Sequence, residues 1–254
     1  MSKVLSFIGN GNMALAIAQG LKDTYKIEVI GRNSSHLDDF EEKLGVNIQK
    51  HALKDFDITG KTIIFGVKPQ NLQEVSTQLQ GKADALYSIL AGTKLESLSN
   101  AIKADAYVRA MPNMAASIQK SMTTLTGDVS LKDEAYEIFS AIGKAHWLGS
   151  EKEIDVATAL AGSGPAYLAL IAEALTDGAV NQGLKRVDAM AIMRGLFDGF
   201  GTLIQDQHPA LLKDTIMSPG GTTAAGYSAL ESGNVRNACI NAITQAKARA
   251  DALS

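Results

Sequence analysis

A glycine-rich turn close to the N-terminus constrains the fold more than any other feature of this sequence. Apolar residues at Val4–Ile8 predict a buried strand, and apolar residues at helical spacing predict a helix over residues 12–22. The turn between them reads Gly9-Asn10-Gly11-Asn12-Met13-Ala14. A second strand is predicted at residues 27–30. This order predicts two parallel strands joined by a crossover helix.

The alternation of strand and helix patterns continues for a little over half of the chain and then stops. Further strands are predicted at residues 62–67, 85–90, 106–109 and 122–125. Helical patterns alone follow, over residues 151–161, 165–182, 187–206 and 226–253. The predicted fold class is therefore α/β, with an N-terminal Rossmann-type doubly wound sheet over residues 1–150 and a C-terminal all-helical domain over residues 151–254.

The helical domain is expected to need a second subunit. Several of its helices carry apolar faces, and a domain of only about a hundred residues leaves part of such faces uncovered. A homodimer is the smallest assembly that would cover them. The only cysteine, Cys239, lies in a helical segment without a nearby histidine, so we expect a buried, inert thiol.

Composition excludes several classes of function. The formal net charge is -3 and no long like-charged run occurs, so neither nucleic acid nor an anionic membrane is an expected partner. No apolar run reaches the roughly 18 uncharged residues of a membrane span, and no signal-peptide core precedes the first strand, so a cytoplasmic protein is expected. No cluster of cysteine and histidine predicts a metal site.

The glycine turn predicts a dinucleotide cofactor. Gly9 can make the tight turn, Gly11 lets the backbone approach a pyrophosphate, and Ala14 allows close packing of helix on strand. Asn10, Asn12 and Met13 complete the turn, where free N–H groups and the helix dipole attract phosphate. A glycine turn without a ligand is the alternative.

The end of the second predicted strand favours NADPH, with NADH as the alternative cofactor. In NAD-binding versions of this fold an acidic residue there binds the ribose 2′-hydroxyl. Here Arg32, Asn33 and Ser34 occupy the place, and the arginine suits a 2′-phosphate. Glu28 lies two residues early, inside the strand, and is a poor substitute. If Arg32 is instead a solvated surface residue, either cofactor is accepted.

Three further turns follow predicted strands, where open parallel sheets bind their ligands. They are Val67-Lys68-Pro69, Ala91-Gly92 and Met111-Pro112-Asn113. Proline fixes the first turn and the lysine offers a positive donor. We expect these turns to contact the cofactor, although a plain solvated lysine fits the spacing equally well.

A second unusual string lies in the helical half, at Ser218-Pro219-Gly220-Gly221-Thr222-Thr223. Two glycines and two hydroxyls at a helix start predict a nest of backbone N–H groups, which prefers an anion such as a carboxylate. A capped turn between two helices is the alternative. Because no Ser/His/Asp set or metal-binding histidine motif occurs, hydride transfer by a cofactor is the favoured chemistry.

Taken together, several strings in order along nearly the whole chain resemble pyrroline-5-carboxylate reductases. These strings are the glycine turn, Val67-Lys68-Pro69-Gln70, Arg109-Ala110-Met111-Pro112-Asn113, Gly162-Ser163-Gly164-Pro165-Ala166-Tyr167, Gln207-His208-Pro209, Ser218-Pro219-Gly220-Gly221-Thr222-Thr223 and Leu230-Glu231-Ser232-Gly233. The resemblance implies NAD(P)H-dependent reduction of 1-pyrroline-5-carboxylate to L-proline, the last step of proline biosynthesis. It also implies a domain-exchanged helical dimer that often assembles into larger rings.

The resemblance also implies roles for individual residues. The loop from Ser218 to Thr223 would hold the substrate carboxylate, and the Thr223 hydroxyl would contact the ring nitrogen. Glu151 is expected to be a further residue on the substrate side. Met114 stands where the family often has threonine, and Ile89 with Leu90 precedes Ala91 where smaller residues are common. These departures concern the details of the pocket.

Two other functions are compatible with parts of the sequence. A β-hydroxyacid dehydrogenase also joins a Rossmann domain to a helical one, but needs a catalytic lysine, for which Lys185 and Lys213 are the candidates. A cofactor-sensing regulatory protein could keep the fold without turnover, because fold alone does not determine function. Pocket volume would decide between a five-membered and a six-membered cyclic imine.

Overall fold

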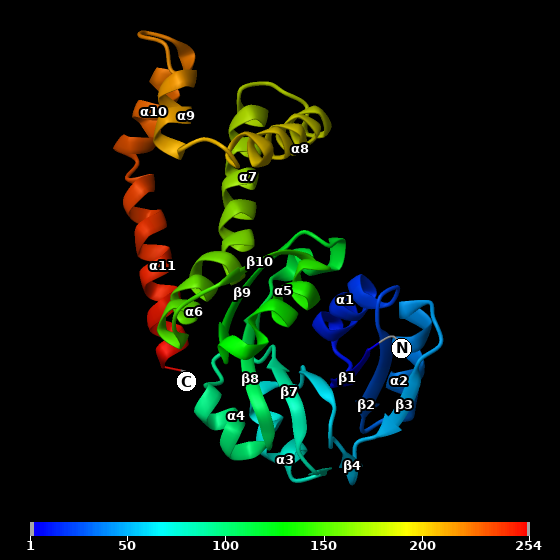
Figure 1. The fold of residues 1–254 in the computed structure, drawn as a ribbon. Helices are drawn as coiled ribbons and strands as arrows, with labels where there is room; N and C mark the ends of the chain where they lie inside the picture. The colour runs from blue at the N-terminus through cyan, green and yellow to red at the C-terminus, as the bar shows by residue number, and fades with distance from the viewer. Residues whose placement is uncertain (1–2, 253–254) are drawn as a thin grey trace. The chain divides into compact units, whose positions relative to one another are not determined.

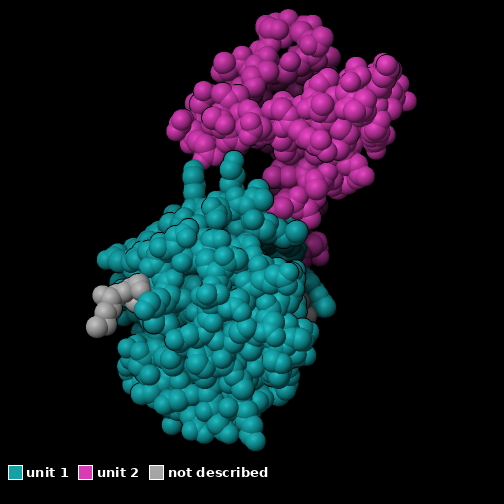
Figure 2. Space-filling model, turned by 90° about the vertical axis from the view of Figure 1, so that its right-hand side faces the viewer, with its two compact units in different colours: residues 1–163, 246–254 teal, residues 164–245 magenta. Residues whose placement is uncertain are grey.

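The computed structural model describes residues 3–252 and divides the chain into two compact units. Unit 1 contains residues 1–163 and 246–254, and unit 2 contains residues 164–245 (Figure 2). The first helical segment, α6 (Glu151–Ala157), belongs to unit 1, and a domain boundary at residue 150 stays a prediction.

Unit 1 is built on an eight-stranded sheet in the order β10-β9-β8-β7-β5-β1-β2-β3 (Figure 1). The strands are β1 (Val4–Ile8), β2 (Lys26–Gly31), β3 (Gln49–Ala52), β5 (Thr62–Phe65), β7 (Ala83–Ser88), β8 (Ala104–Met111), β9 (Ser121–Gly127) and β10 (Gly143–Trp147). Neighbours are parallel except β8 and β9, which are antiparallel. Every predicted strand is present, and the Rossmann-type doubly wound sheet is confirmed.

Helices cover both faces of this sheet (Figure 1). They are α1 (Asn12–Leu21), α2 (Ser34–Leu44), α3 (Leu72–Ser76), α4 (Leu95–Ala101) and α5 (Lys132–Ser140), with short 3₁₀ turns η1 (Pro69–Asn71), η2 (Met114–Ile118) and η3 (Val129–Leu131). Side chains alternate across β1, so Phe7 packs into the core beneath α1, α2 and α5, and Ile8 into the core beneath α3 and α4. A small second sheet pairs β4 (Phe56–Asp57) with β6 (Leu79–Gln80).

In its described part, the chain from Glu151 onward consists of helices joined by short turns and contains no strand. After α6 come a π-helical segment η4 (Thr158–Gly162), α7 (Gly164–Asn181), α8 (Arg186–Leu203), α9 (Pro209–Ile216), α10 (Thr222–Ser232) and α11 (Val235–Asp251). The prediction of one helix over residues 226–253 is wrong. Gly233 caps α10 and Asn234 has a φ of 58°, a left-handed conformation that interrupts the helix before α11.

Unit 2 leaves much apolar surface uncovered. Its exposed large side chains include Leu168, Leu170, Leu175, Ile192, Leu196, Phe200 and Leu203. An 18-residue window within the helical stretch Glu151–Asn181, which begins in unit 1 and continues through α7, has a mean hydropathy of 1.4 and is long and apolar enough to cross a membrane by length and composition alone. Cys239 is exposed on α11, so its predicted burial is wrong for the single chain. Exposed apolar surface of this extent is typical of a protein interface, and a second copy of the chain would bury it.

Candidate cofactor and substrate sites

A cavity of about 570 Å³ opens beyond the carboxyl ends of β1 and β5. These neighbouring strands lie where the strand order reverses, because β1 is followed by β2 on one side of it and adjoins β5 on the other. Open α/β sheets bind ligands at such a position. The predicted cofactor residues that line the cavity are Gly9, Asn10, Gly11, Asn12, Met13, Ala14, Arg32, Val67, Lys68, Pro69 and Ala91.

The glycine turn is shaped as an open cradle. Gly9 has a φ of 107°, and a Cβ atom there would lie 2.7 Å from the carbonyl oxygen of Gly66, so only glycine fits. Gly11 caps α1 without a side-chain hydrogen bond, and a Cβ atom on it would meet nothing within 4 Å. No side-chain cap accepts a hydrogen bond from the first N–H groups of α1, so these groups can donate to a ligand, and the space in front of Gly11 is clear. This arrangement fits a pyrophosphate.

Arg32 lines the cavity at the end of β2, but it already has a partner. Its Nη1 atom lies 2.7 Å from Oε1 of Glu74 on α3, and both side chains are half-exposed. Asn33 caps α2, where its Oδ1 atom accepts a hydrogen bond from the backbone N–H of Ser35 at 2.9 Å. Ser34 is the first residue of that helix. Of these three predicted residues only Arg32 lines the cavity, and Asn33 and Ser34 lie outside the set of lining residues.

Glu28 is removed from the cofactor end of β2, as expected. It is 3% exposed and accepts hydrogen bonds from Ser6 Oγ and, at 2.8 Å, from Lys61 Nζ, while Nε2 of His51 lies 3.2 Å away. Burial raises the pKa of Glu28, but the hydrogen bonds from Lys61 and Ser6 outweigh it, so the pKa lies below its ordinary value. Glu28 is a buried carboxylate with a structural role, because its hydrogen bonds connect β2 to Ser6 on β1 and to Lys61.

The other predicted turns divide between the cavity and its surroundings. Lys68 and Pro69 line it, and Pro69 occupies the first position of η1 behind the Lys68 cap. Gly92, Met111, Pro112 and Asn113 are outside the set of lining residues. Leu53, Asn71 and Val75 also line the cavity and were not predicted from the sequence. Asn71 could have been found from its place in the same turn as Lys68.

Asn113 joins the turn after β8 to the long helix. Its Nδ2 atom donates to the carbonyl oxygen of Ala161 at 3.0 Å, and its Oδ1 atom accepts from the N–H of Ala115 at 3.1 Å. Ala161 lies in the π-helical segment η4. The side chain of Asn113 therefore ties the turn after β8 to η4.

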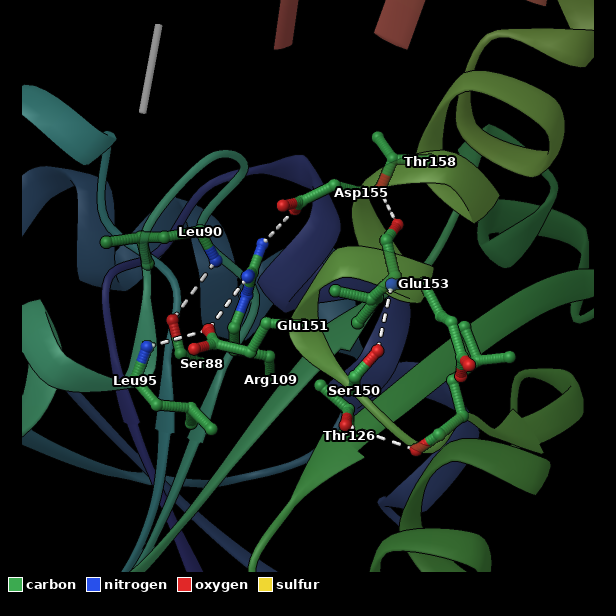
Figure 3. Close-up of polar contacts among 12 residues, drawn as sticks. Ser88, Leu90, Leu95, Arg109, Thr126, Ser150, Glu151, Glu153, Asp155 and Thr158 are labelled. Carbon is green, nitrogen blue, oxygen red and sulfur yellow. Dashed lines mark hydrogen bonds and ion pairs between the residues drawn. The ribbon is translucent and has the colours of Figure 1, made fainter. Parts of the chain in front are cut away.

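A buried arginine ties α6 to the sheet (Figure 3). Arg109 on β8 is 5% exposed, and its guanidinium contacts Oε1 of Glu151 at 2.8 Å and Oδ1 of Asp155 at 2.9 Å. Oε1 of Glu151 also accepts from the N–H of Leu95 at 2.8 Å. We call Arg109, Glu151 and Asp155 the α6 clamp. Glu151, predicted to be on the substrate side, therefore has a structural role, and a contact with substrate stays a prediction.

The loop before α10 forms a tight turn. The N–H of Gly221 donates to the carbonyl of Ser218 at 3.0 Å, Pro219 is the second residue, and Gly220 has a φ of 71°, which are the marks of a type II turn. Gly221 then caps α10 without a side-chain hydrogen bond.

The hydroxyls of this loop are available to a ligand. Thr222 and Thr223 begin α10, and both are exposed. Within residues 3–252, no hydrogen bond engages either hydroxyl, and the first N–H groups of the helix lack a side-chain cap. The turn and the uncapped helix start lie where a nest of N–H groups was predicted, and both the nest and its anion stay predictions.

The two lysines that a β-hydroxyacid dehydrogenase would need as catalytic candidates have structural contacts or positions instead. Lys213 pairs with Asp214 and lies 4.9 Å over the ring of Tyr227, and Lys185 stands at the cap position of α8. His208, from the string Gln207-His208-Pro209, caps α9, where its Nδ1 atom accepts a hydrogen bond from the N–H of Ala210 at 3.3 Å. Among the described residues, no group of three or more His, Cys, Asp or Glu side chains could hold a metal ion.

Comparisons with known proteins agree over the whole chain. A family model described as pyrroline-5-carboxylate reductase dimerisation matches residues 151–253, and one described as NADP oxidoreductase, coenzyme F420-dependent, matches residues 4–92. A pyrroline-5-carboxylate reductase of Helicobacter pylori is 34% identical over 248 residues, which cover 94% of this chain and 96% of the relative.

Solved structures give the same result. A pyrroline-5-carboxylate reductase from Coxiella burnetii has a TM-score of 0.88 at 34% identity, covering 100% of this chain and 99% of that one. The pyrroline carboxylate reductase of Plasmodium falciparum with NADP bound has a TM-score of 0.77 at 25% identity, covering 98% of this chain and 97% of that one.

Proposed function

The chain belongs to the pyrroline-5-carboxylate reductases, and from that premise we propose that it reduces the C=N bond of 1-pyrroline-5-carboxylate to give L-proline. Such an enzyme is an NAD(P)H-dependent oxidoreductase. The observation that carries the proposal is the clear cradle at Gly9 and Gly11, which opens on the cavity at the reversal of strand order. The full-length relationship to the reductases gives the reaction that this cavity serves.

The cofactor we propose is NADPH, with NADH as a weaker alternative. Bound nicotinamide cofactor would supply the hydride. The uncapped N-terminus of α1 would hold the pyrophosphate, and the guanidinium of Arg32 would contact a 2′-phosphate. Two comparisons support this choice, the match to an NADP oxidoreductase model and the NADP bound in the Plasmodium enzyme.

The substrate carboxylate would be held by the turn from Ser218 to Gly221 and the first N–H groups of α10. The Thr223 hydroxyl would then hydrogen-bond the ring nitrogen. No dedicated acid–base pair is required, because the protonated imine accepts hydride at carbon while the C=N electron pair passes to nitrogen. The product amine keeps the proton that the imine carried. These residues orient the imine and fix its charge.

The assembly we propose is a homodimer formed through the helical unit, with a ring of dimers as the larger form. The exposed apolar side chains of α7 and α8 and the match to a dimerisation model support it. A cytoplasmic location remains an expectation from the sequence.

The proposal is tested by measuring oxidation of NADPH in the presence of 1-pyrroline-5-carboxylate. The same assay is run with NADH. A panel of β-hydroxyacids is tested separately in the reverse direction, with the oxidised cofactor. Imine-dependent oxidation is the expected result. Cofactor binding without turnover of the imine would contradict it and favour the sensor. Turnover of a β-hydroxyacid in its place would favour the dehydrogenase.

The role of Thr223 is tested by Thr223→Ala. Loss of one oriented hydrogen bond at the reacting centre should lower kcat by about 10- to 1000-fold. Thr215→Ala is the matched control, because the hydroxyl of Thr215 only contacts the carbonyl of Leu211 within α9. An unchanged kcat in Thr223→Ala would remove this hydroxyl from the reaction.

A further inference from the structure

The adenosine end of the cofactor cavity contains an ion pair that the expected pattern does not include. Arg32 follows β2 and lines the cavity, and its Nη1 atom lies 2.7 Å from Oε1 of Glu74. Glu74 lies on α3 between two residues that line the same cavity, Asn71 and Val75. The arginine that would recognise a 2′-phosphate is therefore already neutralised by a carboxylate from another element.

Glu74 is an acidic side chain in contact with Arg32 at this end of the cavity. The residues that line the cavity include two cations, Arg32 and Lys68, and none of these lining residues is acidic. In NAD-binding members of the fold, a carboxylate at the end of the second strand binds the ribose 2′-hydroxyl. Glu28 cannot serve, because it is buried against Lys61 and Ser6. Glu74 reaches the same end of the cavity from α3.

We infer that Glu74 sets cofactor selectivity by holding Arg32 in competition with a 2′-phosphate. This inference rests on the proposed function, in which the cavity binds NAD(P)H. A 2′-phosphate must displace the Glu74 carboxylate from the guanidinium and then lies near that like charge. A 2′-hydroxyl leaves the pair intact and finds a carboxylate that can accept its hydrogen bond. Glu74 therefore weakens binding of NADPH and makes the site permissive for NADH.

The size of the effect follows from exposure. The side chains of Arg32 and Glu74 are 54% and 56% exposed, so water already screens the pair. Its loss should change affinity by about two- to five-fold, the ratio that corresponds to a solvent-exposed ion pair. The change should fall on ligands with a 2′-phosphate and shrink as ionic strength rises.

The experiment is calorimetric titration of the full chain with 2′,5′-ADP and with 5′-ADP, which differ in the phosphate at issue. We expect Glu74→Gln to bind 2′,5′-ADP about two- to five-fold more tightly and 5′-ADP no more tightly than wild type. Asp39→Asn is the matched control, because Asp39 forms an exposed 2.7 Å pair with Lys43 on α2, with similar exposure. Steady-state kcat/KM for NADPH relative to NADH should rise in Glu74→Gln by the same factor.

A third variant tests whether Glu74 acts through Arg32. In an Arg32→Gln background, Glu74→Gln should increase the affinity for 2′,5′-ADP by less than it does in wild type. The reason is that Glu74 and the 2′-phosphate no longer compete for a guanidinium. Equal tightening of both probes, equal tightening in Asp39→Asn, or no change in Glu74→Gln would overturn the inference and leave the proposed function standing. If wild type binds neither probe, the proposed cofactor cavity fails, and the inference fails with it.

Discussion

Replacing Arg109 should separate the structural role of the α6 clamp from a role in substrate binding. Arg109→Met removes the guanidinium but keeps an apolar stem of similar length. Its two contacts, at 2.8 Å to Glu151 and 2.9 Å to Asp155, are lost together (Figure 3). The carboxylates then remain on α6 without their common partner, and we expect α6 to detach more easily from β8.

The magnitude follows from the geometry and exposure of the three groups. A hydrogen bond to a charged group contributes about 1.5–3 kcal/mol, so two would account for about 3–6 kcal/mol if every group were fully buried. The side chain of Arg109 is 6% exposed, but those of Glu151 and Asp155 are 31% and 19% exposed. Because water solvates part of the freed carboxylates, we expect the free energy of unfolding to fall by about 2–4 kcal/mol. For a chain of this size, that lowers Tm by about 4–16 °C.

The assay is urea denaturation followed by fluorescence of Trp147, the single tryptophan, which lies on β10 in unit 1. Wild type and variants are compared at one protein concentration, since the stability of an oligomer depends on it. Arg32→Met is the control, because its ion pair with Glu74 is exposed and should contribute about 1 kcal/mol or less. A loss in Arg109→Met no larger than that of the control would refute the reasoning.

Glu151→Gln then distinguishes the two roles of Glu151. The amide oxygen can still accept from Leu95 and Arg109, so a purely structural residue should lose only about 1 kcal/mol of stability and leave KM for the imine within about two-fold of wild type. A rise in KM of about ten-fold with unchanged stability would instead place Glu151 at the substrate.

Two further predictions concern the glycine turn and the buried carboxylate. Gly9→Ala should destabilise the chain by about 2–4 kcal/mol because of its φ of 107° and the 2.7 Å approach to a carbonyl, whereas Gly11→Ala should keep the Tm of wild type and weaken binding of NADPH about ten-fold, as thermal melts and cofactor titration would show. The lowered pKa of Glu28 means that its contribution to stability is present above its unfolded pKa of 4.5 and is lost as pH falls through the folded value. Urea denaturation of Glu28→Gln should therefore show a weaker dependence on pH below about 5 than wild type, and parallel profiles would contradict this.

The fold could be predicted where strands are buried on both faces. Thr62–Phe65 and Val4–Ile8 are almost continuous apolar runs, because the parallel strands lie between two layers of helices. The edge strands β3 and β10 were not predicted. Their residues Gln49–Ala52 and Gly143–Trp147 are partly exposed and include lysine and histidine, so they lack the apolar run that marks a strand.

The part of the cavity formed by the glycine turn could be predicted from the sequence, and the part formed by other elements could not. The glycine turn lies within six consecutive residues that line the cavity, so local spacing is enough to identify it. Leu53, Val75 and Glu74 come from elements whose position depends on the packing of the whole sheet. Apolar or acidic side chains at these places look like ordinary core or surface residues in the sequence. The partner of Arg32 is therefore visible only in the folded chain.

The residues just before α7 give a second example of a contact that the sequence alone does not predict. Pro165 is the second residue of α7, which begins at Gly164, and a proline is well tolerated in the first turn of a helix. The chain is already helical before this proline, through the π-helical segment η4, which includes Ala161. The side chain of Asn113 donates to the part-buried carbonyl oxygen of Ala161 at 3.0 Å and so ties the turn after β8 to η4. The proline can be recognised locally, but this hydrogen bond joins residues 48 positions apart and can be found only from the tertiary structure.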